Sequence, residues 1–491
     1  MTATPSAPFS RLAHKLQQPG SYAPLVGAAW LLPALALAFS AAWPVGAWWD
    51  NDINYIIALG RSILTGGFPW TDTLTCNDGL DCIAQQWLFC VVCALLYDSG
   101  GKAAVSALVL ATWAAAAWAV YGACRAAGAS RRTSSALCAA ALLASSVFIK
   151  TNPRGIDVAC LMLSCRAVLE WLDGRDRRAL LIPVACSAAL ANLHCTMWPV
   201  AAMPIACALV DPKTTGRRRE LLLSLVLTTA ASMCSPYGIW STLYVFASMS
   251  GGLSQLGIGE LAPLSAATSP AYFAVFVISS TAYAFLRARS GGGPCCQDAL
   301  FALLTAMAFA QVRNGVLFWP VAATCFATLL RGRFEGTPCI GSSLARFSAC
   351  VLLALGAGGL ALIADDDGVW HEESRRNAVA AIGDAGVTPG SAVLNTFGSG
   401  GWLELAGYRP AYDERAELLL PQINGGHDLA SEVARIKKRY PDDLAKRIEP
   451  GKYRACVLDS YEVPYYRGIM AEYGYRQVYS DENLTAWVRG G

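Results

Sequence analysis

Residues 24–55 read PLVGAAWLLPALALAFSAAWPVGAWWDNDINY, an apolar run that ends in two tryptophans and is followed by two aspartates. The part from 24 to 43 is as long as a helix that crosses a bilayer, which needs roughly 20 apolar residues. A basic stretch, 11–15, precedes it, and the run exceeds the roughly 7–15 apolar residues of a secretory signal. We therefore expect a first membrane span here, with Asp50 and Asp52 at its exit.

Apolar blocks of similar length recur along most of the chain. Of its 491 residues, 55% are hydrophobic and only 15% are charged, with a mean hydropathy of +0.39, whereas soluble domains carry roughly 25% charged residues. Because Lys and Arg mark the cytoplasmic ends of spanning helices, the blocks can be threaded between the basic clusters. This predicts an all-α polytopic membrane domain over 24–363, with about eleven transmembrane helices, after a cytoplasmic segment 1–23. The expected spans are 24–43, 102–124, 134–149, 157–172, 179–194, 197–210, 220–234, 270–287, 298–313, 314–331 and 342–363.

Two further parts are expected on the outer side of the membrane. The first outer loop covers 49–101 and contains a short interfacial helix at 87–97, because eleven apolar residues are too few for a span. The tail, 364–491, has a soluble composition and is expected to form a small extracytoplasmic α/β domain. Its expected elements are strands at 391–397 and 453–461, helices at 373–382 and 428–439, and a turn at Gly398, Gly400 and Gly401. Because no nucleotide-binding glycine motif is present, no nucleic-acid or nucleotide partner is expected.

This arrangement of the predicted spans places nearly all polar residues at helix ends on the outer side of the membrane. A carboxylate at a membrane surface can serve as a general base, so Asp50 and Asp52 are candidate catalytic residues. The alternative is that they solvate a helix end beside interfacial tryptophans. The other polar residues expected on this face are Asp72, Gln85–Gln86, Asn152–Arg154, Asn192–His194, Pro236–Tyr237, Glu260 and Arg313–Asn314.

Several of these residues suggest particular roles. Arg154 and Arg313 are candidate phosphate ligands, since a guanidinium binds phosphate oxygens in a bidentate way. Alternatively, each is a side chain that reaches along the membrane toward water. His194 is a substrate-binding candidate or a hydrogen-bonded structural residue, and Glu260 holds an acceptor hydroxyl or is simply solvated.

The cysteines and possible metal ligands give weaker signals. Cys76 and Cys82 bracket the polar loop CNDGLDC, which on the outer side predicts either a disulfide or two unpaired thiols. Carboxylate oxygens and imidazole would suit a divalent cation, but the spacing of these residues gives no support for a metal site.

The motifs together resemble the GT-C superfamily of membrane glycosyltransferases, relatives of protein mannosyltransferases and aminoarabinose transferases. The resemblance rests on DINYIIALGRSILTGGFPWTDTLT (52–75), QQWLF (85–89), NPRG (152–155), NLH (192–194), SPYG (235–238), GELAPLS (259–265), VRN (312–314) and LNTFGSGGWLELAGYRPAYDER (394–415). It implies that Asp52 matches an aspartate near the reacting centre and Asp72 a later one. Gln86 and Trp87 match the position before the interfacial helix, so with Asp72 they become substrate-binding candidates.

The sequence departs from the GT-C pattern at two positions. Ile56 stands where a histidine is frequent, and Gln86 stands where an acid is common. Both changes remove polar or ionisable groups, so Asp50 and Asp52 remain as the main acid/base candidates. They also leave room for an inactive member of the superfamily.

The resemblance implies a polyprenyl-phosphate-linked sugar as donor and an inverting reaction on the outer membrane face. The acceptor would be an envelope glycan, lipid or protein, and no nucleotide or metal cofactor would be required. We expect a multi-pass protein of the bacterial cytoplasmic membrane whose active face and tail are extracytoplasmic. A transporter or lipid flippase is an alternative, although the inverted repeats and interrupted helices of transporters are not evident. A non-catalytic scaffold for envelope assembly is another.

Overall fold

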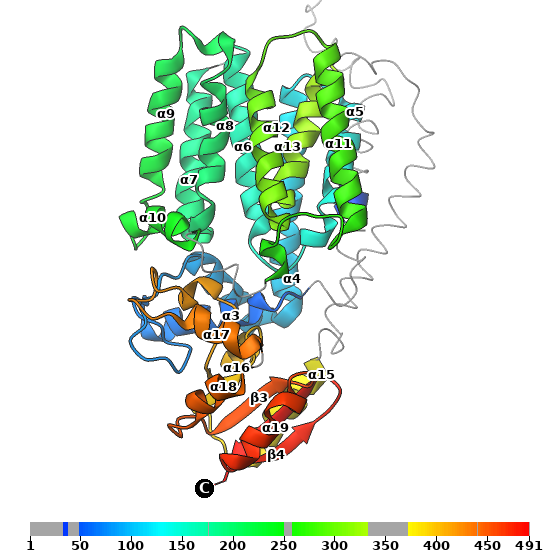
Figure 1. Ribbon diagram of the computed structural model, residues 1–491. Coiled ribbons are helices and arrows are strands. Elements are labelled where there is room, and N and C mark those ends of the chain that lie inside the picture. The colour runs from blue at the N-terminus through cyan, green and yellow to red at the C-terminus, as the bar shows by residue number, and fades with distance from the viewer. Residues whose placement is uncertain are drawn as a thin grey trace, which may run out of the picture.

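The computed structural model describes residues 33–37, 49–174, 176–249, 258–331, 372–438 and 440–490. In these ranges the chain forms a helical bundle and a smaller C-terminal domain, with outer-loop segments between them (Figure 1). The predicted spans 24–43 and 342–363 lie outside the described residues, apart from the short helical piece 33–37.

The bundle consists of helices that run alternately toward and away from the C-terminal domain (Figure 1). Its core includes fully buried Trp113, Trp171 and Phe318. The bundle helices are α4 (Trp87–Ala126), α5 (Arg131–Ala144), α6 (Arg154–Leu172), α7 (Leu181–Leu193), α8 (Pro199–Ala208), α9 (Arg218–Ala231), α11 (Pro270–Arg289), α12 (Cys296–Ala310) and α13 (Gly315–Leu329). Each predicted span inside the described ranges coincides with one of these helices. By length and composition, α4 and α11 are the described helices that could each cross a membrane, so the total of about eleven spans stays a prediction.

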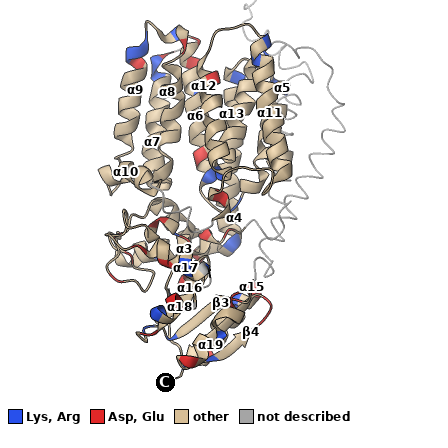
Figure 2. Ribbon diagram, viewed as in Figure 1, with Lys and Arg blue, Asp and Glu red and all other residues tan. Residues whose placement is uncertain are grey.

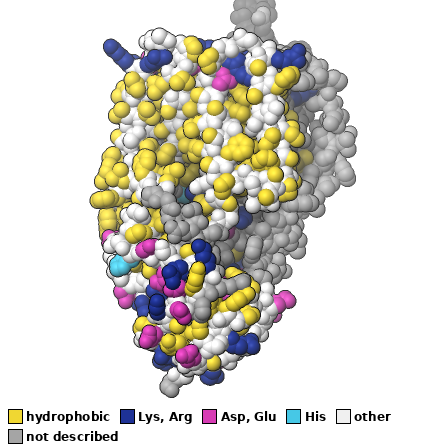
Figure 3. All heavy atoms as spheres, in the orientation of Figure 1, with side chains coloured by type: hydrophobic (Ala, Val, Ile, Leu, Met, Phe, Trp, Pro, Cys, Tyr) yellow, Lys and Arg dark blue, Asp and Glu magenta, His cyan; other side chains and the backbone are white. Residues whose placement is uncertain are grey.

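Positively charged side chains lie at the end of the bundle that the sequence predicts to be cytoplasmic. Figure 2 shows lysines and arginines at the end far from the C-terminal domain, where α5 and α9 begin with Arg131 and Arg218 and α11 ends with Arg289. Figure 3 shows mostly apolar side chains on the visible flank of the bundle, and charged side chains over the C-terminal domain. The polar turns at the other end of the bundle therefore meet the outer loop and the tail.

The outer segment 49–101 is more helical than expected. Helix α3 (Asp52–Gly66) begins at Asp52 itself and buries the continuous run from Ile53 to Gly60. Helix α4 begins at Trp87, as the predicted interfacial helix does, but continues beyond it through a kink at Gly100 and Gly101. The kink relies on a positive φ of 61° at Gly101, a backbone conformation that favours glycine. A further helix, α10 (Ile239–Ser248), lies beside the same end of the bundle (Figure 1).

The C-terminal domain is a five-stranded sheet with helices on both faces, which confirms the expected small α/β domain. The strand order is β2-β1-β3-β5-β4. Strand β1 pairs in parallel with β2 and β3, while β5 runs antiparallel to β3 and β4. The strands are β1 (Ala392–Asn395), β2 (Arg409–Pro410), β3 (Ala455–Asp459), β4 (Tyr475–Ser480) and β5 (Leu484–Arg489). The helices are α15 (Glu372–Asp384), α16 (Gly400–Leu405), α17 (Leu429–Lys437), α18 (Pro441–Ile448) and α19 (Val463–Glu472).

Alternation along the strands divides the core of this domain into two layers, because successive strand side chains point to opposite faces. Val393 and Val457 pack in the cluster that contains α15 and α16 side chains. Leu394 and Leu458 pack in the cluster that contains side chains of α17, α18 and α19. The expected turn at Gly398–Gly401 is partly wrong, because Gly400 and Gly401 begin α16.

Helix α16 is the element that docks the C-terminal domain on the outer segment. It packs against α3, and the contact is so close that a Cβ added at Gly401 would lie 2.7 Å from the backbone nitrogen of Tyr55. A second link joins the start of α15 to α4 just after its kink, where Lys102 Nζ lies 3.4 Å from a Glu372 carboxylate oxygen. The tail is therefore held against the residues that follow the first predicted span.

Candidate active site

The three polar residues of the DND segment have three different surroundings. The Asp50 backbone N–H donates to Thr151 Oγ1 at 2.8 Å, and its carboxylate accepts a hydrogen bond from Asn152 Nδ2 at 3.2 Å. Asn51 instead contacts the tail, donating to the Gly398 carbonyl at 2.8 Å and accepting from Arg375 at 2.6 Å.

Asp52 lies in the first turn of α3 and differs from Asp50 and Asn51 in its hydrogen bonding. Its carboxylate makes no hydrogen bond to any residue in the described part of the chain, and it stays partly accessible. Burial raises the pKa of Asp52 well above its ordinary value, and repulsion from Asp50, Glu414 and Glu260 adds to this, against the attraction of Arg154. A carboxylate whose pKa is raised is a stronger base and is suited to accept a proton.

Glu414 brings a third carboxylate to this place from the tail. One of its oxygens accepts the Gly401 N–H at 2.9 Å, while the other is buried without a hydrogen-bond partner among the described residues. Burial raises the pKa of Glu414 to about 8, and repulsion from Asp413 contributes, while the Gly401 N–H and Arg375 oppose the shift. The tail therefore supplies a proton-binding group next to Asp52.

Arg154 and Glu260 form the cationic side of the site. Arg154 starts α6, and its Nη2 pairs with the Glu260 carboxylate of the segment before α11. Burial acts to raise the pKa of Glu260, but the charge and hydrogen bond of Arg154 outweigh it, and the pKa is lowered. Nη1 of Arg154 is buried without a hydrogen-bond partner among the described residues. We call Asp50, Asp52, Arg154, Glu260 and Glu414 the open cluster.

Arg313 adds a second guanidinium near the open cluster. It lies in the short 3-10 turn η7 (Val312–Asn314) between α12 and α13. Its guanidinium lies within reach of the charges of Arg154, Glu417 and Glu260. The two predicted phosphate ligands therefore lie in the same region of the site.

His194 is held at the end of α7 by a residue that the sequence reading did not single out. Its Nδ1 lies 2.9 Å and 3.0 Å from the two carboxylate oxygens of Asp157 on α6. It neighbours Glu417, whose pKa is raised by burial and lowered in part by the charges of Arg313 and His194. Of the predicted site residues, the structure therefore groups Asp50, Asp52, Arg154, Glu260 and Arg313. His194 lies near Glu417, which Arg313 also approaches.

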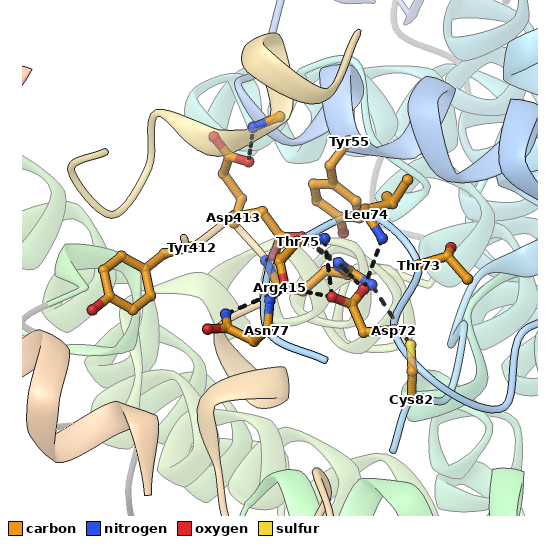
Figure 4. Close-up of polar contacts among 12 residues, drawn as sticks. Tyr55, Asp72, Thr73, Leu74, Thr75, Asn77, Cys82, Tyr412, Asp413 and Arg415 are labelled. Atoms are coloured by element: carbon orange, nitrogen blue, oxygen red, sulfur yellow. Dashed lines mark hydrogen bonds and ion pairs between the residues drawn. The ribbon is translucent and has the colours of Figure 1, made fainter. Parts of the chain in front are cut away.

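Asp72 does not join this group. Its carboxylate accepts a hydrogen bond from Arg415 at 2.7 Å and from the Thr75 backbone N–H at 3.0 Å, with the Asp72 side chain 0% exposed. Arg415 also bonds Asp413, through Nε at 2.7 Å (Figure 4). Burial acts to raise the pKa of Asp72, but Arg415 and Thr75 outweigh it and the pKa is lowered. We call Asp72, Asp413 and Arg415 the closed cluster, because it leaves Asp72 no place for a substrate.

Of the two alternatives for Cys76 and Cys82, the structure shows the unpaired thiols, both of them buried, and not the disulfide. The two side chains belong to different packing clusters, and Arg415 Nη1 approaches Cys82 Sγ at 3.6 Å (Figure 4). The loop is held by the tail instead. The Cys76 N–H donates to the Pro410 carbonyl at 2.9 Å, and Asn77 donates to the Ala411 carbonyl at 2.7 Å.

Gln86 and Trp87 also lie outside the open cluster. Buried Gln86 donates to the Tyr55 hydroxyl at 2.7 Å, and the Trp87 indole donates to Asn192 Oδ1 at 3.1 Å. Their contacts join the start of α4 to α3 and α7. The side chain of the neighbouring Gln85 instead donates a hydrogen bond to the Glu417 carboxylate of the tail.

Within the described ranges, no three His, Cys, Asp or Glu side chains are arranged to hold a metal ion. The absence of a metal requirement stays a prediction.

Sequence reasoning missed the residues that the tail and α6 contribute. These are Glu414, Glu417, Arg375, Arg415 and Asp157. The acid-rich run YDERAE after a strand was one available signal, and an aspartate in the first turn of an apolar helix was another. Neither signal identifies the partner residue, which in each case comes from another element.

Comparison with known proteins shows the fold. No family model and no curated protein matches the sequence. The oligosaccharyltransferase of Archaeoglobus fulgidus, in its apo form, matches with a TM-score of 0.60 at 12% identity, covering 97% of this chain and 75% of the other. ArnT from Cupriavidus metallidurans matches in the apo state with a TM-score of 0.51 at 12% identity, covering 95% of this chain and 100% of the other. ArnT bound to undecaprenyl phosphate matches with a TM-score of 0.50 at 13% identity, covering 95% and 98%.

These likenesses span nearly the whole chain, bundle and tail together. They confirm the resemblance inferred from the motifs at the level of the fold. Two described helices, α4 and α11, are long and apolar enough to cross a membrane. The chain therefore shares the fold of the oligosaccharyltransferase and of ArnT.

Proposed function

We propose that this chain is a membrane glycosyltransferase that moves a sugar from a polyprenyl-phosphate donor to a hydroxyl of an envelope glycan, lipid or protein. The observation that carries the proposal is the Asp52 carboxylate, which is free of hydrogen bonds to the described residues and has a raised pKa. The shared fold supports the reaction class, and the ArnT structure with undecaprenyl phosphate supports the class of donor.

In the proposed reaction, Asp52 accepts the proton of the acceptor hydroxyl while the hydroxyl oxygen attacks the anomeric carbon. The new carbon–oxygen bond forms as the bond to the donor phosphate breaks, and the polyprenyl phosphate leaves with the electron pair. Such a displacement inverts the anomeric centre. The free Nη1 of Arg154, with Arg313 nearby, would stabilise the charge that develops on the leaving phosphate.

Asp50 and Glu414 have supporting roles in this proposal. After burial, the charge of Asp50 is the next cause that raises the pKa of Asp52, and Glu414 adds to it when it is ionised, which strengthens Asp52 as a base. Asp50 is fixed by Asn152, so it shapes the field around Asp52 rather than taking the proton. The tail, which carries Glu414, would border the entry of the acceptor and select it.

We place the site on the extracytoplasmic face of the bacterial cytoplasmic membrane. The basic clusters at the far end of the bundle support this orientation, since such clusters stay on the cytoplasmic side. The tail would then lie outside the membrane beside the site. The proposal needs no nucleotide and no metal cofactor, and this remains a prediction.

The test compares lipids and envelope glycans in a strain that lacks the gene. The strain is complemented with wild type, with Asp52→Asn or with Asp98→Asn, a control at an exposed ion pair with Arg61 in the same outer segment. We expect one polyprenyl-phosphate sugar to accumulate and one glycan residue to disappear in the deletion strain. Wild type and Asp98→Asn restore both, and Asp52→Asn restores neither.

Two results would contradict the proposal. Full restoration by Asp52→Asn, at equal protein abundance, would remove Asp52 from the chemistry. Unchanged lipid and glycan profiles in the deletion strain would instead favour the transporter or scaffold alternatives.

A further inference from the structure

We infer that α10 (Ile239–Ser248) is an interfacial helix whose exposed apolar face lies in the acyl chains of the outer lipid leaflet. The partner of this face is therefore a lipid surface. The inference rests on the membrane location in the proposed function, and it adds to that location a lipid-contact surface outside the predicted spans.

The exposed face of α10 consists of large apolar side chains. They recur at intervals of three or four residues, which places them on one side of the helix. The segment 239–249, IWSTLYVFASM, contains no charged residue. The exposed side chains are Ile239, Trp240, Leu243 and Phe246, with Met249 directly after the helix, and they are between 44% and 68% exposed. In water, all of this apolar area would stay in contact with solvent.

The opposite face of α10 carries the polar groups. Ser241 Oγ donates to the Ser232 carbonyl at 2.7 Å, and Thr242 Oγ1 lies 2.7 Å from Ser232 Oγ. Ser241, Thr242 and Tyr244 are all buried. A surface helix in water turns its polar side outward and its apolar side inward. Because α10 has the reverse arrangement, we expect lipid rather than water around its exposed side.

Helix α10 lies at the end of the bundle that the sequence predicts to be on the outer side. Helix α9 begins at Arg218, at the predicted cytoplasmic end, and ends at Ala231, and the chain turns at Gly238 before α10 begins. Figure 1 shows α10 lying across the end of the bundle nearest the outer segment. Helix α9, which leads to it, exposes Leu223 and Val226, and Figure 3 shows apolar side chains along the bundle flank. The apolar face of α10 therefore continues this flank at the predicted membrane surface.

The outer segment contributes a second exposed tryptophan beside α10. The exposed ring of Trp70 meets the Tyr237 ring edge to face, with 5.0 Å between the ring centroids. The Tyr237 hydroxyl donates to the Pro69 carbonyl at 2.7 Å and accepts the Ala84 N–H at 2.9 Å. Tryptophan is enriched where a membrane meets water. Trp70 and Trp240, from two separate segments, thus mark the same region as interfacial.

The extent and chemistry of the face favour lipid over a second protein chain. A stable protein interface buries roughly 800 Å² on each partner and involves about 20–30 residues a side. The exposed face of α10 offers five large side chains and no charged group for a polar rim. Acyl chains need neither a larger area nor a polar rim.

The buried face of α10 joins this lipid contact to the outer loop and the tail. Tyr244 lines a pocket together with Gln85 of the outer loop and Glu417 of the tail. The Gln85 side chain in turn bonds Glu417. Contact with lipid would therefore hold the junction between the outer loop and the tail at a fixed height on the membrane surface.

The test maps lipid contacts of the full-length protein in phosphatidylcholine vesicles. The photoreactive amino acid benzoylphenylalanine replaces one residue at a time, at Phe246 of α10, at Ile278 near the middle of α11 or at Tyr461 of the tail. These positions are 61%, 68% and 60% exposed, so each probe reaches its surroundings equally well. After irradiation, mass spectrometry identifies the adducts and the acyl carbons that reacted. Thermal unfolding checks that each protein is folded.

We expect lipid adducts at Phe246 and at Ile278 in similar yield, and none above background at Tyr461. The apolar face of an interfacial helix lies about 5–10 Å into the boundary between headgroups and acyl chains. The probe at Phe246 should therefore react with the acyl carbons nearest the glycerol. The probe at Ile278 should react with carbons toward the ends of the chains.

The outcomes separate this inference from the proposed function. If Ile278 gives lipid adducts and Phe246 gives none, α10 does not contact lipid, and the membrane location stands. If Ile278 gives none either, the membrane location and this inference both fail. Adducts of Phe246 with a second copy of the chain would identify a protein interface and overturn the inference. Adducts of Phe246 at the ends of the acyl chains would also overturn it, because α10 would then lie deep in the bilayer.

Discussion

Two clusters of carboxylates and arginine lie at the junction between the outer segment and the C-terminal domain, and they differ in how completely their atoms are paired. In the closed cluster, Arg415 is 7% exposed and bonds Asp72 and Asp413, whose side chains are 0% and 1% exposed. In the open cluster, the Asp52 carboxylate and Nη1 of Arg154 lack partners among the described residues. Glu260, the partner of Arg154, is 40% exposed.

The difference shows how the same side-chain chemistry serves two purposes. A buried ionic network that is fully paired makes its elements adopt one arrangement. Here it fixes the outer loop to the tail, over a sequence separation of 343 residues between Asp72 and Arg415. A cluster that keeps unpaired groups leaves them for a ligand. The closed cluster therefore holds together the outer segment and the tail, which both contribute residues to the open cluster.

Breaking the closed cluster should have the largest effect on stability. Arg415→Ala leaves two buried carboxylates without their cation, which typically costs about 3–5 kcal/mol of the free energy of unfolding. Chemical unfolding of the purified protein measures this cost. Arg61→Ala, at an exposed ion pair with Asp98, is the control, with an expected cost of about 1 kcal/mol or less. Equal stability of the two variants would show that the closed cluster does not join the domains.

Filling the contact between α16 and α3 should have a smaller effect. Gly401→Ala places a Cβ 2.7 Å from the Tyr55 nitrogen and 2.8 Å from Glu414 Oε2, and overpacking of this kind costs about 1–3 kcal/mol. Gly468→Ala in α19 meets no atom within 4 Å and should be neutral or slightly stabilising. Thermal unfolding of both variants gives the comparison, and a Gly401→Ala protein as stable as Gly468→Ala would refute the close approach.

The pH dependence of stability should reveal the unpaired carboxylate of the tail. The pKa of Glu414 is raised in the folded protein to about 8, so the protonated form is favoured by folding. Its contribution is fully present below the unfolded pKa and is lost as the pH rises from about 4.5 through about 8. The melting temperature should thus fall less over this range in Glu414→Gln than in wild type. Glu449→Gln, at an exposed position, should follow wild type, and identical slopes for all three proteins would exclude the raised pKa.

The smallest expected effect concerns the thiols next to the closed cluster. Because Cys76 and Cys82 are free, reducing agent should leave the melting temperature unchanged. Alkylation of the denatured, unreduced protein followed by mass spectrometry should label both residues. Protection of both thiols until a reductant is added would restore the disulfide prediction.

Much of the bundle could be predicted from the sequence, and less of the tail. Apolar blocks between basic clusters are local signals, so the sequence predicts α5 to α9 and α11 to α13 to within a few residues at most ends, although it gives no prediction of α10. Strands β1 and β3 have continuous apolar runs. Strand β4, which is mostly exposed, has no such run, and its pairing with β5 is set by contacts rather than by composition.

The site was predictable as a list of residues on one face, but not as two clusters. Asp52 and Asp72 both lie in the predicted outer loop, and both are site candidates, Asp72 through the resemblance alone. Only the fold shows that Arg415 reaches Asp72 and leaves Asp52 free. For the same reason Cys76 and Cys82 suggested a disulfide, since the tail strand that holds their loop is more than 300 residues away.

The most direct test of the account compares Asp52→Asn with Asp72→Asn in one transfer assay, with rates normalised to the amount of folded protein. We predict that Asp52→Asn stays folded and loses on the order of a hundredfold or more in transfer rate, the loss expected for a missing general base. Asp72→Asn should be less stable, yet transfer sugar at a near-normal rate per folded molecule. A normal rate in Asp52→Asn, or a stable Asp72→Asn protein that has lost transfer, would contradict the division between the open and the closed cluster.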